Sequence, residues 1–354
     1  MIESRKTMHQ HGGDIYSHKN VLDFSANINF RGMPESVKEA ARAGVDHCMH
    51  YPDTACRKLR DVIAQREQVE PGQVICGNGA ADLIFSLVLA QKPREALVTA
   101  PAFFEYEQAL RTVGCEIKYH YLEESKGFLL QRDILKAISP KTDLVFLCNP
   151  NNPTGICISP ELLKEILKRC EECRTLLTVD ECFLDFLENG ESLSMKQYLS
   201  SDRNLFILKA FTKMYAMAGL RLGYGLSDDR GLLERIRNMR QPWGVSIPAQ
   251  MAGIAAAREM EFAADSRRII QKEREYLQDK MEQMGYRILG GAANYLFFQG
   301  PLDLYKVCLE KGILIRDCGN YKGLKPGWYR IAVKSREENQ ELLAALEQAA
   351  KRNT

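Results

Sequence analysis

Short apolar runs alternate with amphipathic stretches between residues 72 and 226. This alternation is typical of parallel strands joined by crossover helices. Strands are expected at 97–100, 144–148, 176–180 and 205–208. They are apolar along their whole length, as strands covered on both faces are. Helices are expected at 80–89, 104–113 and 160–173. Ser159 and Pro160 open the last of these helices as N-cap and first helical residue.

The last third of the chain has a different pattern, which predicts a smaller α+β domain. It begins with a long charged stretch, expected to be one helix from 247 to 284. Two β-like runs follow at 295–298 and 329–333, and a final helix is expected from Glu337 onward.

The first 44 residues have no strong hydrophobic period and contain several glycines, so we expect an arm or loop that lies over another part of the molecule. A length of 354 residues favours two domains. The predicted organisation is an arm at 1–44 that joins the small domain, a large domain at 45–246 and a small domain at 247–354.

Composition narrows the class of function. The chain is 45% hydrophobic and 27% charged, which excludes a wholly disordered protein. Its net charge of +2 gives no electrostatic basis for nucleic-acid binding, and no apolar run is long enough to cross a bilayer. The 11 cysteines are scattered and residues 1–6 lack the apolar core of a signal peptide, so we expect a cytoplasmic protein with free thiols. The Cys170 and Cys173 pair has no partner pair at zinc-site spacing, so no metal site is expected.

A further strand is expected to end at 75–76. Distinctive residues follow it and the strands at 144–148, 176–180 and 205–208, at the ends where a parallel sheet binds its ligands. The segment 77–82 is a glycine turn that opens a helix and offers backbone N–H groups to an anion. The segment 149–155 is a polar turn with two prolines. Asp180 ends an apolar strand, where a buried carboxylate needs a partner, and Lys213 precedes Arg221 after another strand. Each feature has an ordinary structural explanation by itself, but together they predict a ligand site.

These segments read Asn-Pro-Asn-Asn-Pro-Thr-Gly from 149, Asp-Glu-Cys-Phe from 180, Thr-Lys-Met-Tyr from 212 and Gly-Leu-Arg-Leu-Gly-Tyr from 219. In this combination the chain resembles the fold-type I pyridoxal 5'-phosphate enzymes of the class I/II aminotransferase family over almost its whole length. The resemblance implies the α/β fold of the PLP-dependent transferases. In that fold a large cofactor-binding domain, with a mostly parallel sheet between helices, is joined to a smaller α+β domain.

The resemblance also implies roles for individual residues. Lys213 matches the Schiff-base lysine, Asp180 the partner of the pyridinium nitrogen, and Asn152 the donor to the ring hydroxyl oxygen. Phe103 matches the aromatic residue that stacks on the ring. The cofactor's phosphate cup is matched by Gly79, Ala80, Thr212 and Arg221. Tyr51 resembles the tyrosine that reaches this phosphate from the other subunit, which implies a homodimer.

Other residues are expected to bind the substrate, and a few depart from the family pattern. Arg330 interrupts an apolar strand and is expected to clamp a substrate carboxylate together with Arg316. Asn27 and His11, on the N-terminal arm, are expected to help bind a substrate phosphate. The family usually has a tyrosine where this chain has Phe183, and a Ser or Thr where it has Ala210. Trp243 is interpreted as core packing at a domain joint.

Within the family, the resemblance is strongest to the threonine-phosphate decarboxylases of cobalamin biosynthesis and next to the histidinol-phosphate aminotransferases. The first implies a lyase that removes CO2 from a small phosphorylated amino acid, and the second implies an aminotransferase. A hypothesis from a different class is a catalytically idle module that binds the cofactor as a sensor.

Overall fold

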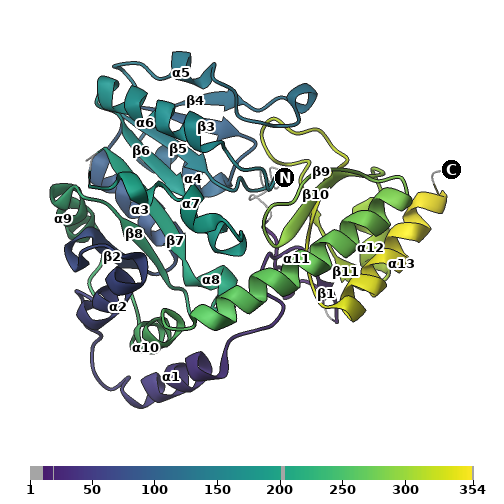
Figure 1. Cartoon of the computed structure of the whole chain (residues 1–354), viewed down its shortest axis with the longest axis horizontal. Helices are drawn as coiled ribbons and strands as arrows, with labels where there is room; N and C mark the ends of the chain where they lie inside the picture. Colours follow the sequence, from purple (N-terminus) through teal and green to yellow (C-terminus); the bar gives the residue numbers. More distant parts are fainter. Residues whose placement is uncertain (1–10, 19, 201–203, 353–354) are drawn as a thin grey trace, which may run out of the picture.

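The computed structural model describes residues 11–18, 20–200 and 204–352. Figure 1 shows two main β-sheets, a large one on the left and a smaller one on the right, with a long helix running between them. No helix in the described part of the chain combines the length and the apolar character that a membrane span requires. All 11 cysteines are free thiols.

The large sheet has the order β2-β8-β7-β6-β5-β3-β4 (Figure 1). Its strands are β2 (Val74–Gly77), β3 (Glu95–Ala100), β4 (Glu116–Tyr121), β5 (Leu144–Cys148), β6 (Leu176–Asp180), β7 (Leu205–Ala210) and β8 (Gly223–Leu226). Neighbours from β7 to β4 pair in parallel, whereas β8 runs antiparallel to both β2 and β7. The predicted α/β fold with a mostly parallel large sheet is therefore confirmed.

Helices cover both faces of this sheet, which explains why its central strands are apolar throughout. Those of the large unit are α2 (Arg57–Glu67), α3 (Ala80–Gln91), α4 (Phe104–Thr112), α5 (Ile134–Ala137), α6 (Pro160–Cys173), α7 (Gly190–Leu193), α8 (Phe211–Met214) and α9 (Arg230–Met239). Helices α3, α4 and α9 share one apolar cluster, and α2 and α6 share the other. Ser159 caps α6 as predicted, because its hydroxyl accepts a hydrogen bond from the Leu162 N–H at 3.2 Å.

The small sheet is antiparallel and has the order β12-β13-β10-β9. Its strands are β9 (Arg287–Gly290), β10 (Tyr295–Gln299), β12 (Arg316–Asp317) and β13 (Trp328–Ala332). The helices beside it are α11 (Met260–Gln283), α12 (Leu304–Glu310) and α13 (Arg336–Arg352) (Figure 1). A separate parallel pair joins β1 (Leu22–Asp23) to β11 (Ile313–Leu314). The predicted α+β character of this part of the chain is confirmed.

The expectation that residues 1–44 lack regular structure was wrong. Besides β1, this segment contains most of helix α1 (Glu35–Asp46). Val37 and Gly44 are the buried residues of α1, and the rest of this short helix is partly or fully exposed. The helix packs on α10 (Ile247–Ala256), where a Cβ added at Gly44 would lie 2.6 Å from the Pro248 Cα. Residues 1–10 lie outside the described part, and the two boundaries between the three predicted segments stay predictions.

The single helix expected from 247 to 284 is in fact two helices, α10 and α11, separated by residues 257–259. Neither proline nor glycine marks this break. Helix α10 is mostly apolar and packs against α1 and α2, while α11 is charged and runs toward the small sheet (Figure 1). Glu259, between them, accepts a hydrogen bond from the Ser36 hydroxyl. Tertiary contacts therefore redirect the chain at a point where local propensity does not.

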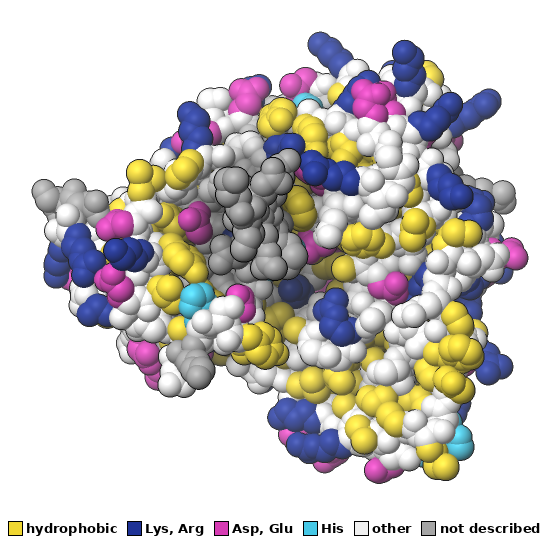
Figure 2. Space-filling model, turned by 180° about the vertical axis from the view of Figure 1, so that it is seen from behind, with side chains coloured by type: hydrophobic (Ala, Val, Ile, Leu, Met, Phe, Trp, Pro, Cys, Tyr) yellow, Lys and Arg dark blue, Asp and Glu magenta, His cyan; other side chains and the backbone are white. Residues whose placement is uncertain are grey.

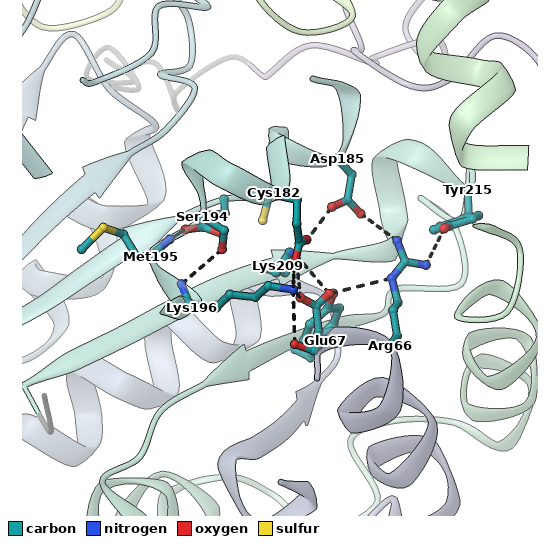
Figure 3. A network of polar contacts seen from close by, with 12 residues as sticks. Arg66, Glu67, Cys182, Asp185, Ser194, Met195, Lys196, Lys209 and Tyr215 are labelled. Atoms are coloured by element: carbon teal, nitrogen blue, oxygen red, sulfur yellow. Dashed lines mark hydrogen bonds and ion pairs between the residues drawn. The ribbon is translucent and has the colours of Figure 1, made fainter. Parts of the chain in front are cut away.

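A buried ion pair ties helix α2 to strand β7 (Figure 3). The Lys209 ammonium lies 3.0 Å from each carboxylate oxygen of Glu67, and the Tyr224 hydroxyl donates to the same carboxylate at 2.6 Å. Lys196 adds a second cation at 3.5 Å. Buried charges are stable only when they are paired and hydrogen-bonded in this way.

The same network continues to the segments that follow β6 and β7 (Figure 3). Arg66, beside Glu67 on α2, pairs with Asp185 at 3.3 Å and donates a hydrogen bond to the Tyr215 hydroxyl. Asp185 follows the end of β6, and Tyr215 follows the turn of helix α8. The network therefore holds in place the two strand ends from which Asp180 and Lys213 project.

We predict that Glu67→Ala lowers the free energy of unfolding by about 3–5 kcal/mol, because it leaves the Lys209 ammonium buried without its main partner. The double variant Glu67→Leu/Lys209→Met removes both charges and is expected to lose much less. Denaturant unfolding of the cofactor-free protein, followed by circular dichroism, measures both. Equal losses in the two variants would contradict the pairing argument.

Candidate active site

A cavity of about 330 Å³ opens where the strands β5, β6 and β7 end. It is lined by most of the residues that the sequence singled out: His11, Asn27, Ala80, Phe103, Asn152, Asp180, Thr212, Lys213, Arg221, Arg316 and Arg330. Gly79 lies next to it, against the guanidinium of Arg221. Tyr51 is absent from its lining. The cavity thus gathers residues from the N-terminal segment, the large sheet and the small sheet.

Lys213 is held as a reactive amine. Burial lowers the pKa of its side chain to about 8, and the nearby positive charges of Arg330 and Arg221 act in the same direction. The ammonium nitrogen lies 5.6 Å from the centre of the Phe183 ring, which forms one wall. A lysine with this pKa has a substantial neutral fraction at physiological pH, as a nucleophilic amine requires.

Asp180 is a buried carboxylate at the end of β6. The hydroxyl of Tyr106 donates to its Oδ2 at 2.6 Å, and the backbone N–H of Cys182 donates to its Oδ1 at 2.9 Å. These hydrogen bonds orient the carboxylate beside the cavity, where it can pair with a cationic nitrogen of a bound group.

Asn152 and Arg330 are joined across the two sheets. Arg330 donates from Nη1 to the side-chain oxygen of Asn152 and from Nη2 to the Ser25 carbonyl at 2.8 Å. Because the amide oxygen of Asn152 is engaged in this way, its amide nitrogen is the group left to donate to a ligand. Nε of Arg330 is buried and finds no hydrogen-bond partner in the described part of the chain.

Arg316 and Arg330 are direct cross-strand neighbours on β12 and β13. Like charges directly opposite each other destabilise a sheet unless an anion lies between or beside them. Asn27 is buried nearby in the same cavity, and within the described ranges neither its amide nitrogen nor its amide oxygen has a hydrogen-bond partner. Unsatisfied buried groups of this kind are costly, so this end of the cavity is built for an anionic, hydrogen-bonding ligand.

The opposite end forms a cup for a second anion. Gly79 is the N-cap of α3 and has a φ of +81°, a conformation that favours glycine. A Cβ at this position would lie 2.5 Å from Nη2 of Arg221. Free N–H groups at the start of α3, the Thr212 side chain and the Arg221 guanidinium therefore meet at one place. Ala210 also lines the cavity, so the hydroxyl usual in the family is missing there.

Tyr51 and Trp243 lie on the surface and not in the core. Their exposed fractions are 77% and 48%, and their rings stack on each other with centroids 4.6 Å apart. The interpretation of Trp243 as core packing was therefore wrong. A tryptophan followed by glycine can occur both at a domain interface and on a surface, so the local sequence does not distinguish the two.

The sequence did not identify as functional either Tyr106, which contacts Asp180 from outside the cavity lining, or Glu105, which belongs to that lining. Tyr106 lies three positions after Phe103, and this spacing places both residues on one side of α4. The position of Phe103 could therefore have indicated that Tyr106 also faces the site, where it contacts Asp180. Glu105 lines the cavity although its position next to Phe104 marks it only as a helix-start acid. The phenol absent at Phe183 is not replaced by Tyr295, whose hydroxyl donates to the Asn151 carbonyl at 2.8 Å.

The arrangement fits pyridoxal 5'-phosphate. The amine of Lys213 suits the aldehyde, the carboxylate of Asp180 suits the ring nitrogen, and the cup at the start of α3 suits the phosphate. Phe103 provides an aromatic wall. Within the described ranges, His, Cys, Asp and Glu side chains form no group of three or more suited to a metal ion.

Comparison with known proteins agrees with this geometry. The family described as aminotransferase class I and II matches residues 19–346. A threonine-phosphate decarboxylase from Salmonella typhimurium is 37% identical over 95% of each chain. Histidinol-phosphate aminotransferase 2 from Carboxydothermus hydrogenoformans is 30% identical over 92% of this chain and 90% of its own. The crystal structure of the histidinol-phosphate aminotransferase from Clostridium acetobutylicum superposes with a TM-score of 0.87 at 29% identity, covering 94% of this chain and 100% of that one.

We predict that the cofactor-free protein captures pyridoxal 5'-phosphate faster as pH rises, with a midpoint near 8, because only the neutral amine of Lys213 attacks an aldehyde. Arg330→Met is expected to move the midpoint upward, because it removes a positive charge that lowers the lysine pKa. Stopped-flow absorbance measures the rate. A midpoint that is unchanged in Arg330→Met would contradict this electrostatic account.

Proposed function

Because this chain belongs to the class I and II aminotransferase family and is a pyridoxal 5'-phosphate-dependent enzyme, we propose that it decarboxylates L-threonine O-3-phosphate. The products are (R)-1-amino-2-propanol O-2-phosphate and CO2, and the pathway served is cobalamin side-chain biosynthesis. The similarity to the Salmonella typhimurium threonine-phosphate decarboxylase supports this choice.

The observation that carries the proposal is the cross-strand pair of Arg316 and Arg330 at one end of the cavity. Threonine phosphate has both a carboxylate and a phosphate, and guanidinium groups bind each of these in a bidentate manner. Arg330 holds the carboxylate together with Arg316, while His11 and Asn27 help bind the phosphate. The unpartnered amide of Asn27 supports this assignment.

The cofactor is held by the residues on the other side of the cavity. Bound pyridoxal 5'-phosphate supplies an electron sink for the electrons released at the substrate Cα. Lys213 provides the amine that binds it, Asp180 holds a proton on the ring nitrogen, and Asn152 donates to the ring oxygen. Phe103 stacks on the ring. The phosphate is bound by Gly79, Ala80, Thr212 and Arg221.

The alternative is an aminotransferase of the histidinol-phosphate type. It is favoured by the structural similarity to the Clostridium acetobutylicum enzyme of that name. In that case the two arginines take the phosphate of one substrate and the carboxylate of the other in turn. A catalytically idle sensor is less well supported, because the lowered pKa of Lys213 and the unpartnered groups in the cavity prepare the site for chemistry.

We predict that the purified holoenzyme releases CO2 from threonine phosphate and forms aminopropanol phosphate without a keto acid. Arg330→Ala is expected to raise KM by about 10-fold or more, since a charge-assisted hydrogen bond contributes about 1.5–3 kcal/mol. Lys213→Ala is expected to abolish turnover. Transfer of the amino group from histidinol phosphate to a keto acid, without CO2 release, would favour the alternative.

We also propose a homodimer in which Tyr51 completes the cofactor site of the partner subunit. Figure 2, which views the molecule from behind Figure 1, shows hydrophobic side chains gathered at the lower right. Exposed apolar residues near Tyr51 include Val45, Met49 and Trp243. Such a patch is typical of a protein interface. The free thiols on all cysteines support a reducing cytoplasm as the location.

Subunit mixing tests the role of Tyr51. We predict that Tyr51→Ala and Lys213→Ala are each nearly inactive, and that an equal mixture refolded together regains about a quarter of wild-type activity, since half the dimers are mixed and each has one intact site. Activity of the mixture is measured against each parent. If Tyr51 acts within its own subunit, the mixture gains nothing.

A further inference from the structure

Glu105 has no part in the function proposed above, although its side chain enters the cavity. It lies in the first turn of α4, two residues after Phe103, and its side chain is only 15% exposed. Oε1 lies 3.4 Å from Nδ1 of His11. Oε2 is buried and has no hydrogen-bond partner among the residues that the structure describes. A buried carboxyl oxygen without a donor calls for an explanation.

The surroundings of Glu105 favour its neutral form. Burial raises its pKa to about 7, although Lys213 on α8 and Arg316 on β12 oppose this rise, while Asp180 at the end of β6 adds to it. Burial and Arg316 lower the pKa of the facing His11. The free protein therefore has a mixture of neutral and ionised Glu105 near pH 7 and mostly the ionised form at pH 8, while the lowered pKa keeps the imidazole of His11 largely uncharged. When His11 donates from Nδ1 to Oε1, Oε2 is the atom left to hold a proton and donate it.

We propose that Glu105 binds the substrate as a neutral carboxylic acid, donating a hydrogen bond from Oε2 to an anionic oxygen of the substrate phosphate, so that binding takes up one proton from solvent. This inference rests on the proposed function only in requiring a ligand with a phosphate and a carboxylate. It assigns Glu105 as a substrate-binding residue and makes affinity depend on pH.

Charge balance supports the proton uptake. A phosphate monoester brings about −1.5 to −2 charges at neutral pH and a carboxylate brings one more. Among the residues that the structure describes, Arg316 and Arg330 are the guanidinium groups that line this end of the cavity. An ionised Glu105 adds a further negative charge to a ligand that already exceeds these two positive charges. Protonation removes that repulsion and creates a donor.

The test uses the holoenzyme and 3-phosphoglycerate, which carries a phosphate and a carboxylate but has no amine to react with the cofactor. Titration calorimetry at pH 8, in two buffers of different ionisation enthalpy, measures the protons taken up. We expect close to one proton for the wild type. The Kd should rise by up to about 10-fold from pH 7.5 to 8.5, the limit for one linked proton.

Glu105→Gln keeps the size and a donor but cannot titrate, so we expect uptake to disappear and the Kd to vary less than about 2-fold over this range. Glu107→Gln, on the same helix but outside the cavity lining, is the matched control and should behave as wild type. Absorbance of the bound cofactor verifies that each variant is folded and loaded.

Two results would overturn the inference: proton uptake retained in Glu105→Gln, whether or not His11→Gln loses it, or no binding of the probe by the wild type at any pH. The CO2 assay on the same preparations is independent. An enzyme that transaminates but shows the Glu105-dependent uptake disproves only the proposed function, whereas CO2 release without that uptake disproves only the inference.

Discussion

The rest of the site depends on keeping the amine of Lys213 out of water without giving it a carboxylate partner. Burial and the neighbouring guanidinium groups lower its pKa to about 8. A close ion pair with Asp180 would have the opposite effect. That carboxylate is instead satisfied by the Tyr106 hydroxyl and the Cys182 N–H. The carboxylate of Asp180 and the amine of Lys213 are therefore not paired with each other, and each is positioned to bind a different part of one ligand.

Asp180 and Lys213 stay apart only if the strand ends that carry them are held rigidly. Lys209, the partner of Glu67 in the buried ion pair, lies on strand β7, four residues before Lys213. Arg66 ties the segments after β6 and β7 to helix α2 (Figure 3). Such a pair contributes little net stability compared with apolar packing, but it is costly to break. Its position beneath both strand ends fits a role in fixing their geometry.

The two sheets divide the work of binding. The large sheet supplies the cofactor side, and the small sheet brings Arg316 and Arg330 to face it. Arg330 links the halves through Asn152 and Ser25. The cost of placing two arginines opposite each other is offset when an anion binds, which couples the substrate side to the cofactor side.

The sequence by itself determined the central strands, because strands covered on both faces are apolar throughout. The motifs around Asn152, Asp180 and Lys213 likewise identified the family and the cofactor. Only the tertiary structure decided what weak local signals left open. Helix α1 has two buried positions, and the break between α10 and α11 has neither proline nor glycine. The contact of Glu105 with His11 joins residues 94 positions apart, and no local pattern reports the burial that raises the Glu105 pKa.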